Sequence, residues 1–359
     1  MANPPPPYSD VTGISRAAMK DNAQLTLANY NGNARPGELV VDQTTDSVYV
    51  GNAAGQLTLV ASIGGATTWA LLGDKNNASG PEQIALGQQA GATGQGENAV
   101  AIGRRAGETT QGESAVAIGE QAGMTTQGWQ AVAVGLSAGF TGQGNRAVAI
   151  GWEAGYTGQG EEAVAIGWLA GADTQGESAI AIGEEAGKTE QSVAAVAVGY
   201  AAGWTAQGLH AVAVGREAGY DTQGETATSV GPGAGNYTQG IGAVAIGYTS
   251  GGSNQSANAV AVGTAAGNDS QGIAAVAIGY TAGQIGQGIS AVAIGRAAGY
   301  DSQANNSIIL NATGANLNQT TANTFTVKPV RAVSGGVPPG GFSAMYYNPT
   351  TGEIIVVTV

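Results

Sequence analysis

Aromatic rings recur in the central part of this 359-residue chain, and most of them directly follow a glycine. Glycine favours turns, so the rings that follow it are expected to project outward. Exposed tryptophan and tyrosine stack on sugar rings, but they also pack on one another without any ligand. The candidate glycan-binding residues, with mutual packing as the alternative, are Trp129, Trp152, Tyr156, Trp168 and Trp204.

Glutamine recurs every 16 residues from Gln95 to Gln303. Identical amides stacked in register hydrogen-bond from one layer to the next, as in the ladders of stacked strands. We therefore expect a structural ladder; the alternative is a row of amides that binds a sugar. The first six members are Gln95, Gln111, Gln127, Gln143, Gln159 and Gln175.

Residues of catalytic or metal-binding type are scarce. The chain has one histidine, His210, and no cysteine, which argues against a histidine triad, a multi-histidine metal site and thiolate ligands within one chain. No nucleophile stands out beside a base, and the Gly-x-x-Gly stretches lack the strand-to-helix context of a nucleotide loop. The sequence therefore predicts a structural or binding role, with no enzymatic activity, no metal and no cofactor.

Charge and hydropathy narrow the range of partners. The formal net charge is −13, which argues against nucleic acid as a partner. No apolar stretch approaches the length of a membrane span, so we expect no membrane insertion. The first residues, which include Pro4 to Pro7, lack the basic and apolar regions of a secretory signal, so none is expected.

A run of internal repeats positions all these residues. A glycine that closes an Ala-Val-Ala-Ile-Gly type segment recurs fourteen times, every 16 residues, from Gly87 to Gly295. Sixteen residues are not a whole number of helical turns, and each repeat carries glycines and β-branched residues that weaken helices. Ala-Val-Ala-Ile is typical of a strand, and Gly-x-Thr-x-Gln of a second extended segment with a turn. The repeats therefore predict a parallel β-solenoid of about 14–15 coils, one repeat to a coil.

The predicted strand is apolar on both sides. Val148 and Ile150 point to one face, whereas Ala147 and Ala149 point to the other. One face must fill the coil, and the other needs a cover that nothing else in the repeat supplies. We infer that further copies of the chain cover it; an alanine face left in water is the alternative. Burial of the valine and isoleucine is expected to contribute about 3–6 kcal/mol per coil.

Two features break the regularity of the repeats. Ten residues after the closing glycine, the early coils carry acidic residues such as Glu113, and the later coils carry apolar residues such as Ile273. We expect this row to be wet in the first half and nearer a subunit contact in the second. The stretch from Thr226 to Gly235 has Thr228 and Ser229 in place of Val and Ala. We interpret it either as an ion or water site or as an irregularity without function.

The repeat motif resembles that of a known family. Ala-Val-Ala-Ile-Gly-x-x-Ala, as at residues 147–154, is similar to the head repeat of the YadA-like trimeric adhesins. In-phase copies cover residues 84–310, about two thirds of the chain. The resemblance implies a left-handed parallel β-roll assembled as a homotrimer. The repeat is longer than is typical of those adhesins, and we recognise neither a signal peptide nor a C-terminal membrane anchor, so a surface autotransporter is not expected.

The two ends resemble segments of bacteriophage fibre proteins. Residues 35–51 contain two strand-forming stretches around a polar turn, which predicts a β-hairpin. Residues 306–354 are similar to the stretch that precedes the chaperone domain of phage tail fibres and tailspikes. The predicted domains are an N-terminal virion-attachment segment at 1–75, a β-roll shaft at 76–311 and a C-terminal capping or tip segment at 312–359.

Together the resemblances imply an all-β, homotrimeric fibre protein on the virion of a tailed phage, on its tail or its capsid. Its partners would be other virion proteins, through the N-terminal segment, and a host surface glycan. A bacterial cell-surface adhesin head is the first alternative. An ice-binding solenoid is the second, and it would use a row of threonines that is broken at Asp173: Thr109, Thr125, Thr141 and Thr157.

Overall fold

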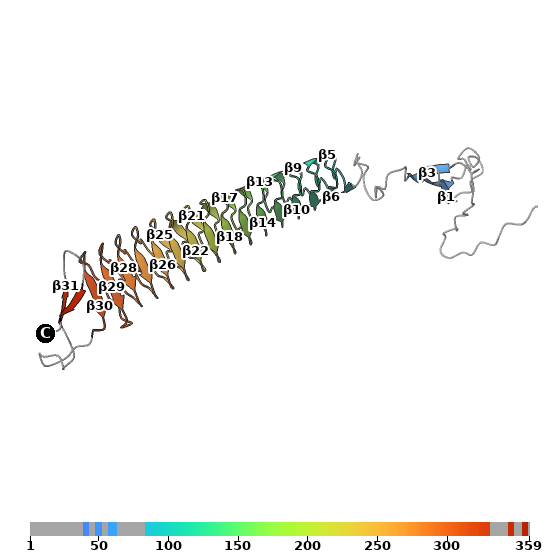
Figure 1. Ribbon diagram of the computed structural model, residues 1–359. Helices are drawn as coiled ribbons and strands as arrows, with labels where there is room; N and C mark the ends of the chain where they lie inside the picture. Colours follow the sequence, from blue (N-terminus) through green and yellow to red (C-terminus); the bar gives the residue numbers. More distant parts are fainter. Residues whose placement is uncertain are drawn as a thin grey trace, which may run out of the picture.

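The computed structural model describes residues 83–330 with their side chains and, outside this range, the backbone of five short strands. Residues 83–330 form a rod of stacked coils (Figure 1). One sheet of 16 strands runs along the rod, which at about 4.8 Å per strand gives a length of about 70 Å. The predicted all-β parallel solenoid of about 15 coils is confirmed, and the described residues contain no helix.

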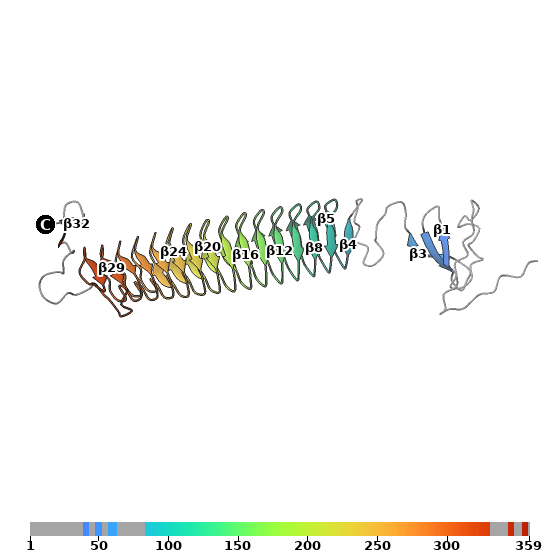
Figure 2. The ribbon, with the colours of Figure 1, turned by 60° about the horizontal axis from the view of Figure 1, so that its bottom comes forward.

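Each regular coil contributes one strand to each of two parallel sheets, as Figure 2 shows for the larger sheet. We call the larger one the Val/Ile sheet. Its strands are β4 (Ile84–Leu86), β6 (Val100–Ile102), β8 (Val116–Ile118), β10 (Val132–Val134), β12 (Val148–Ile150), β14 (Val164–Ile166), β16 (Ile180–Ile182), β18 (Val196–Val198), β20 (Val212–Val214), β22 (Thr228–Val230), β24 (Val244–Ile246), β26 (Val260–Val262), β27 (Val276–Ile278), β28 (Val292–Ile294), β29 (Ile308–Asn311) and β30 (Phe325–Lys328).

The second sheet, which we call the Thr/Gln sheet, has 11 strands. They are β5 (Thr93–Gln95), β7 (Thr109–Gln111), β9 (Thr125–Gln127), β11 (Thr141–Gln143), β13 (Thr157–Gln159), β15 (Asp173–Gln175), β17 (Thr189–Gln191), β19 (Thr205–Gln207), β21 (Asp221–Gln223), β23 (Tyr237–Gln239) and β25 (Ser253–Gln255). Beyond β25 the pairing continues as isolated bridges as far as Asp301. The second extended segment predicted in each repeat is therefore confirmed.

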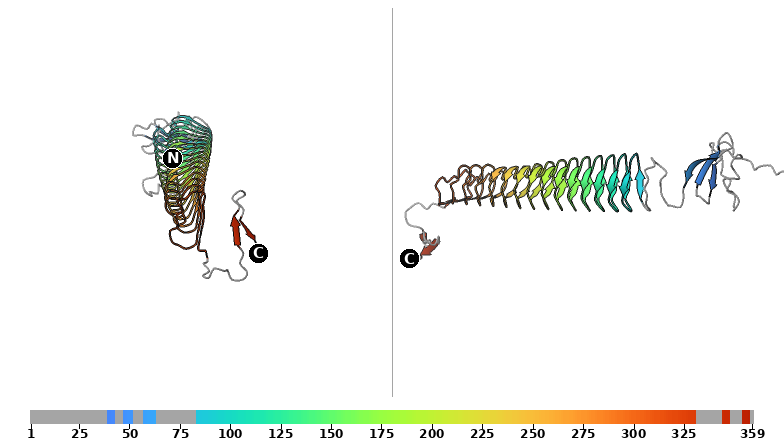
Figure 3. Two further views of the ribbon diagram at one scale, coloured as in Figure 1. Left: turned by 90° about the vertical axis from the view of Figure 1, so that its left-hand side faces the viewer. Right: turned by 90° about the horizontal axis from the view of Figure 1, so that it is seen from above.

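The register between coils equals the sequence repeat. In β12 and β14, Val148 pairs with Val164, Ala149 with Ala165 and Ile150 with Ile166, all in parallel. Equivalent side chains therefore lie directly above one another along the rod. Figure 3 shows the same stacking seen from above, with the coils following one another along one axis. Each position of the repeat consequently becomes a row, and a row is the unit in which any surface of this rod must be described.

Glycines close the coil where no side chain fits. Gly151 has a φ of +132°, and a Cβ placed on it would lie 2.6 Å from the carbonyl oxygen of Gly167 in the next coil. Gly155 has a φ of +54°, and its Cβ would lie 2.8 Å from Cδ of Gln159 inside the coil. Both positions are glycine in all the repeats because backbone conformation and space exclude a side chain there.

Alanine and glutamine, and not valine and isoleucine, fill the inside of the coils. Ala149 and Ala154 are fully buried, Gln159 is 2% exposed, and Ile150 is 39% exposed. The expectation that buried Val and Ile supply about 3–6 kcal/mol per coil is therefore wrong for this chain by itself. A coil of 16 residues closes so tightly that methyl groups and one flat amide fill its interior. The branched side chains are left on the outer face.

Short strands flank the repeats. Strands β29 and β30 extend the Val/Ile sheet past residue 311. Near the start of the chain, β1 (Leu39–Asp42) pairs antiparallel with β2 (Ser47–Gly51), which confirms the hairpin predicted at residues 35–51, and β3 (Leu57–Ser62) joins β2. Strands β31 (Ala344–Tyr347) and β32 (Ile354–Val357) pair antiparallel. The rest of the attachment and tip segments, including Pro4 to Pro7, lies outside the described residues.

Candidate binding surface

Each coil presents four surfaces to its surroundings. Two are the outer faces of the Val/Ile sheet and of the Thr/Gln sheet. The other two are edges made by turns. In the coil that begins at residue 147, residues 151–156 form what we call the long edge, and residues 160–163 form the short edge. Because the register is fixed, the same four surfaces run along the whole regular part of the rod.

The glutamines stack inside the rod, not on its surface. Nε2 of Gln111 donates to Oε1 of Gln127 at 3.1 Å, and Gln127 donates in the same way to Gln143 at 3.0 Å. Equivalent bonds link every following pair as far as Gln287 and Gln303. Each amide nitrogen also contacts backbone carbonyls of its own coil, as Gln159 does with Val148 at 2.9 Å. Amides buried in this way are not available to grip a sugar.

The first predicted member of the ladder stands apart from it. Nε2 of Gln95 donates to the carbonyls of Ile84 and Ala99, at 2.9 and 3.2 Å, and makes no hydrogen bond to the next glutamine. The Oε1 atoms of Gln95 and Gln111 are consequently buried without a hydrogen-bond partner. The chain of amide–amide bonds therefore begins at Gln111.

The five candidate aromatic residues do not form one site, because they lie in three rows. Trp152 and Trp168 share the row directly after the closing glycine, at the outside of the long edge. Tyr156 and Trp204 lie four positions later on the same edge, where they are half-buried. Trp129 lies on the short edge and is 40% exposed. Sequence spacing could have found this division, since the remainder on division by 16 assigns each residue to its row.

Rings in the same row stack on each other from coil to coil. Trp152 and Trp168 lie with their ring centroids 5.6 Å apart and their planes 17° from parallel. Trp204 stacks on Tyr220 at 5.0 Å, and burial under these rings raises the pKa of the Tyr220 hydroxyl. A further pair that the list of candidates missed, Phe140 and Tyr156, stacks at 4.8 Å. One face of each ring is thereby occupied by the chain itself.

Cations cover two of the remaining rings. The guanidinium carbon of Arg146 lies 5.0 Å from the ring centre of Trp129, and Nζ of Lys188 lies 5.4 Å from that of Trp204. Such contacts hold a ring in place without any ligand. The mutual-packing alternative therefore accounts for much of the aromatic surface, although Trp152 remains 51% exposed.

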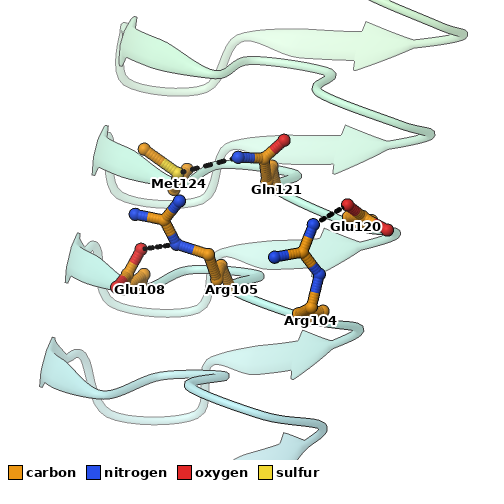
Figure 4. Close-up of polar contacts among 6 residues, drawn as sticks. All are labelled: Arg104, Arg105, Glu108, Glu120, Gln121 and Met124. Atoms are coloured by element: carbon orange, nitrogen blue, oxygen red, sulfur yellow. Dashed lines mark hydrogen bonds and ion pairs between the residues drawn. The ribbon is translucent and has the colours of Figure 1, made fainter.

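Charged side chains occupy the long edge near the beginning of the rod (Figure 4). Arg104 forms an ion pair with Glu120 in the next coil, and Arg105 donates to Glu108 of its own coil at 2.7 Å. Figure 4 shows these side chains side by side on one surface, which alternates in charge. Exposed pairs of this kind contribute little to stability, typically 0–1 kcal/mol.

The row ten residues after the closing glycine lies on the short edge throughout. Glu113 is exposed, and Ile273 is 50% exposed. The expected difference in exposure between the two halves is therefore wrong for a single chain. The physical reason is that a turn position points outward in every coil, whatever residue occupies it. His210, in the neighbouring row, is likewise exposed.

The irregular stretch at residues 226–235 alters the interior of the rod. Ser229 takes the place of an alanine, is fully buried, and donates from Oγ to Oε1 of Gln239 at 2.8 Å. Its hydroxyl also accepts from Nε2 of Gln223 at 3.3 Å. Ser250 likewise replaces an alanine in the next coil. The alanine core consequently divides into two clusters, one on each side of this region. Neighbouring glutamines satisfy the Ser229 hydroxyl, which needs no ion.

Threonines align in the Thr/Gln sheet but do not make a continuous face. Thr141 pairs with Thr125 on one side and with Thr157 on the other. The row then passes to Asp173, and further on to Asp221 and Tyr237. An ice-binding surface needs a flat repeated array, and this row is interrupted by charge and by an aromatic ring.

An apolar strip lies open along the outer face of the Val/Ile sheet. The valines are half-buried, and most of the row that follows two residues later is exposed. The exposed members, at 36–40% of their accessible area, are Ile118, Ile150, Ile182, Val230, Ile246, Ile278, Ile294 and Ile308. The strip is continuous because the register is fixed.

No protein-family model, curated protein or solved structure matches this chain. Between residues 83 and 330, no group of three or more His, Cys, Asp or Glu side chains is arranged to hold a metal ion. The described part of the chain also has no helix that is long and apolar enough to cross a membrane.

Proposed function

We propose that this chain is the structural fibre protein of a tailed phage virion, a rigid rod of three parallel copies that serves host adhesion. The observation that carries the proposal is the apolar strip on the Val/Ile sheet. The rod has an interior of its own, so this strip is a second apolar surface, and a copy of the same chain has the matching strip in the same register.

The dimensions of the strip support burial against other copies. It runs about 70 Å along the rod, and its two rows lie about 7 Å apart, since they are two residues apart on a strand. This gives on the order of 500 Å², near the upper end of the largest apolar patch on a typical monomer. Association of parallel copies along the whole strip would bury it without any change in the coil.

The number of copies and the biological setting rest on the resemblances. The similarity of residues 147–154 to the repeat of trimeric adhesins supports three chains and a left-handed coil. The similarity of the two ends to phage fibre segments supports a position on the virion, with the N-terminal segment bound to other virion proteins. In this proposal the rod is a shaft that spaces its tip from the particle, with a host surface glycan as the further partner.

The mass of the assembly tests the proposal. Light scattering on the purified protein is expected to give three times the chain mass of 35.2 kDa. The variant Ile150→Glu/Ile182→Glu is expected to dissociate, because unpaired carboxylates buried at an interface cost several kcal/mol. The matched control is Thr109→Glu/Thr141→Glu, with the same spacing on the opposite sheet, and it should stay trimeric. A single-chain mass for the unaltered protein would rule out the assembly.

Labelling of intact particles tests the setting. Antibodies raised against residues 83–330 are expected to mark thin appendages of purified phage particles in electron micrographs. Label confined to the surface of bacterial cells would instead favour the adhesin head.

We also propose that the rod has no catalytic activity. Host polysaccharide incubated with the trimer is expected to keep its chain length. Release of oligosaccharides, absent in a heat-denatured sample, would overturn this part of the proposal and would make the protein a degrading tailspike.

A further inference from the structure

The long edge is interrupted by a cavity of about 370 Å³ in the second half of the rod. It spans the turns of consecutive coils around residues 216–268 and is open to solvent. Its walls include Arg216, Tyr237 and Tyr248, and its floor includes Pro232, Gly233 and Gly252. The volume lies in the lower part of the range that small-molecule sites occupy, about 300–1,000 Å³. We call this cavity the notch.

Three small residues in successive turns create the notch. Pro232 and Gly233 stand where the preceding coil has Arg216 and Glu217, so two long side chains are missing. Gly252 stands in the row that carries aromatic or polar side chains in the coils before it. Because the rows are in register, these absences fall side by side and leave one open volume.

The backbone does not require the glycine at the centre of the notch. A Cβ on Gly233 would meet only the side chain of Thr249 at 3.4 Å and its Cα at 4.0 Å, which are ordinary contacts. Other coils hold Gln89 and Gln121 in the same row at the same left-handed φ of 60°. Gly233 therefore differs from Gly151, whose missing side chain is dictated by the next coil. The space at Gly233 is a property of this place on the surface.

The walls of the notch are aromatic and polar. Tyr248 is 60% exposed and Tyr237 is 52% exposed. Tyr248 takes part in none of the ring stacks or cation contacts found between described residues, so its ring faces are free. Asn268 donates from Nδ2 to the carbonyl of Thr249 at 2.7 Å, and Asn236 donates to that of Glu217 at 3.0 Å. These bonds hold both amides in fixed positions.

The charge of the notch is balanced. Nη2 of Arg216 donates to Oε1 of Glu217 at 2.8 Å, so the cation at the wall already has its counter-ion. An anionic ligand would have to displace that carboxylate. A neutral ligand can accept the remaining N–H groups of the guanidinium while the ion pair stays intact.

From these features we infer that the notch binds one neutral hexose unit of a carbohydrate. The apolar face of a sugar ring lies on an exposed tyrosine ring, and sugar hydroxyls exchange hydrogen bonds with amides, hydroxyls and guanidinium groups. Tyr248 supplies the ring, Arg216 and Asn268 the polar contacts, and Gly233 the space. All these residues come from one chain, so the inference does not depend on the fibre role or on the number of copies.

Sugar binding to the full-length protein tests the inference. The probes are the methyl glycosides of glucose, galactose, mannose and N-acetylglucosamine, with methyl glucuronide as the acidic probe, followed by saturation-transfer NMR and calorimetry. At least one neutral glycoside is expected to bind more tightly than the glucuronide. Tyr248→Ala is expected to weaken binding by about tenfold. Gly233→Gln, which fills the notch with a residue that other coils carry in this row, is expected to abolish binding.

Tyr280→Ala is the matched control, since Tyr280 lies in the same row as Tyr248, is 54% exposed, and lies outside the notch. It should leave the affinity unchanged. The inference is overturned if no neutral glycoside binds, if the glucuronide binds best, or if Gly233→Gln binds as well as the unaltered protein. Light scattering on the same samples separates the two proposals, because a rod that binds sugar as a single chain contradicts the trimer and leaves the notch standing.

Discussion

Inside the rod one coil repeats the next: Ala149 lies on Ala165, and Gln159 donates to Gln175 at 3.1 Å. On the long edge the same coils differ, with Trp152 and Trp168 stacked in one place and Arg216 beside Pro232 in another. The interior has room for methyl groups and one amide, so each change there affects the coil above and the coil below. The edge faces solvent and can change from coil to coil. Stability therefore belongs to the interior rows, and recognition can vary along the edge without cost to the fold.

The largest effect is expected from a side chain forced between two coils. Gly151→Ala places a Cβ 2.6 Å from the Gly167 carbonyl at a φ of +132°. It should lower the free energy of unfolding by about 3 kcal/mol, measured by urea unfolding followed by circular dichroism. The control is Gly158→Thr, because neighbouring coils carry Thr126 and Thr174 at that position with a φ near 55°. Equal losses in the two variants would contradict the account of the closing glycine.

The next effect is expected from a break in the amide ladder. Gln159→Leu keeps the size of the side chain but leaves the Val148 carbonyl and the Gln175 amide oxygen without their donors. We expect a loss of about 2 kcal/mol in the same urea experiment. Gln95→Leu is the matched control, since Gln95 makes backbone contacts only. It should cost less, and an equal cost would show that the amide–amide bonds contribute nothing.

A smaller effect is expected on the long edge. Trp152→Ala/Trp168→Ala removes one ring stack and should lower stability by about 0.5–1.5 kcal/mol. Adsorption of phage that carries this variant to host cells is expected to be unchanged, because these rings are already packed on each other. Lost adsorption with an intact trimer would instead make the tryptophan pair a receptor site and would move recognition away from the notch.

The smallest effect is expected from the exposed ion pair between Arg104 and Glu120. Arg104→Ala should change the free energy of unfolding by less than about 0.5 kcal/mol, and added salt should reduce even that difference. A loss as large as that of Gln159→Leu would mean that the edge stabilises the rod as much as its interior does.

Much of the architecture followed from counting residues in the sequence. The 16-residue period, with a glycine and a glutamine fixed in each unit, determined one repeat per coil and the two extended segments. It also placed equivalent residues in rows, because identical units stack in identical register. The hairpin near Ser47 followed from local strand and turn signals, since those act over a few residues.

Only the tertiary structure decided which apolar face is inside. Alternation separates Ala149 from Ile150 but treats the two sides of the strand alike. The tight closure of the coil makes the choice, because its interior holds methyl groups and a glutamine, and this leaves the isoleucines outside. The notch has the same origin. Pro232, Gly233 and Gly252 are ordinary small residues in the sequence, and they form one open volume because the register brings them side by side.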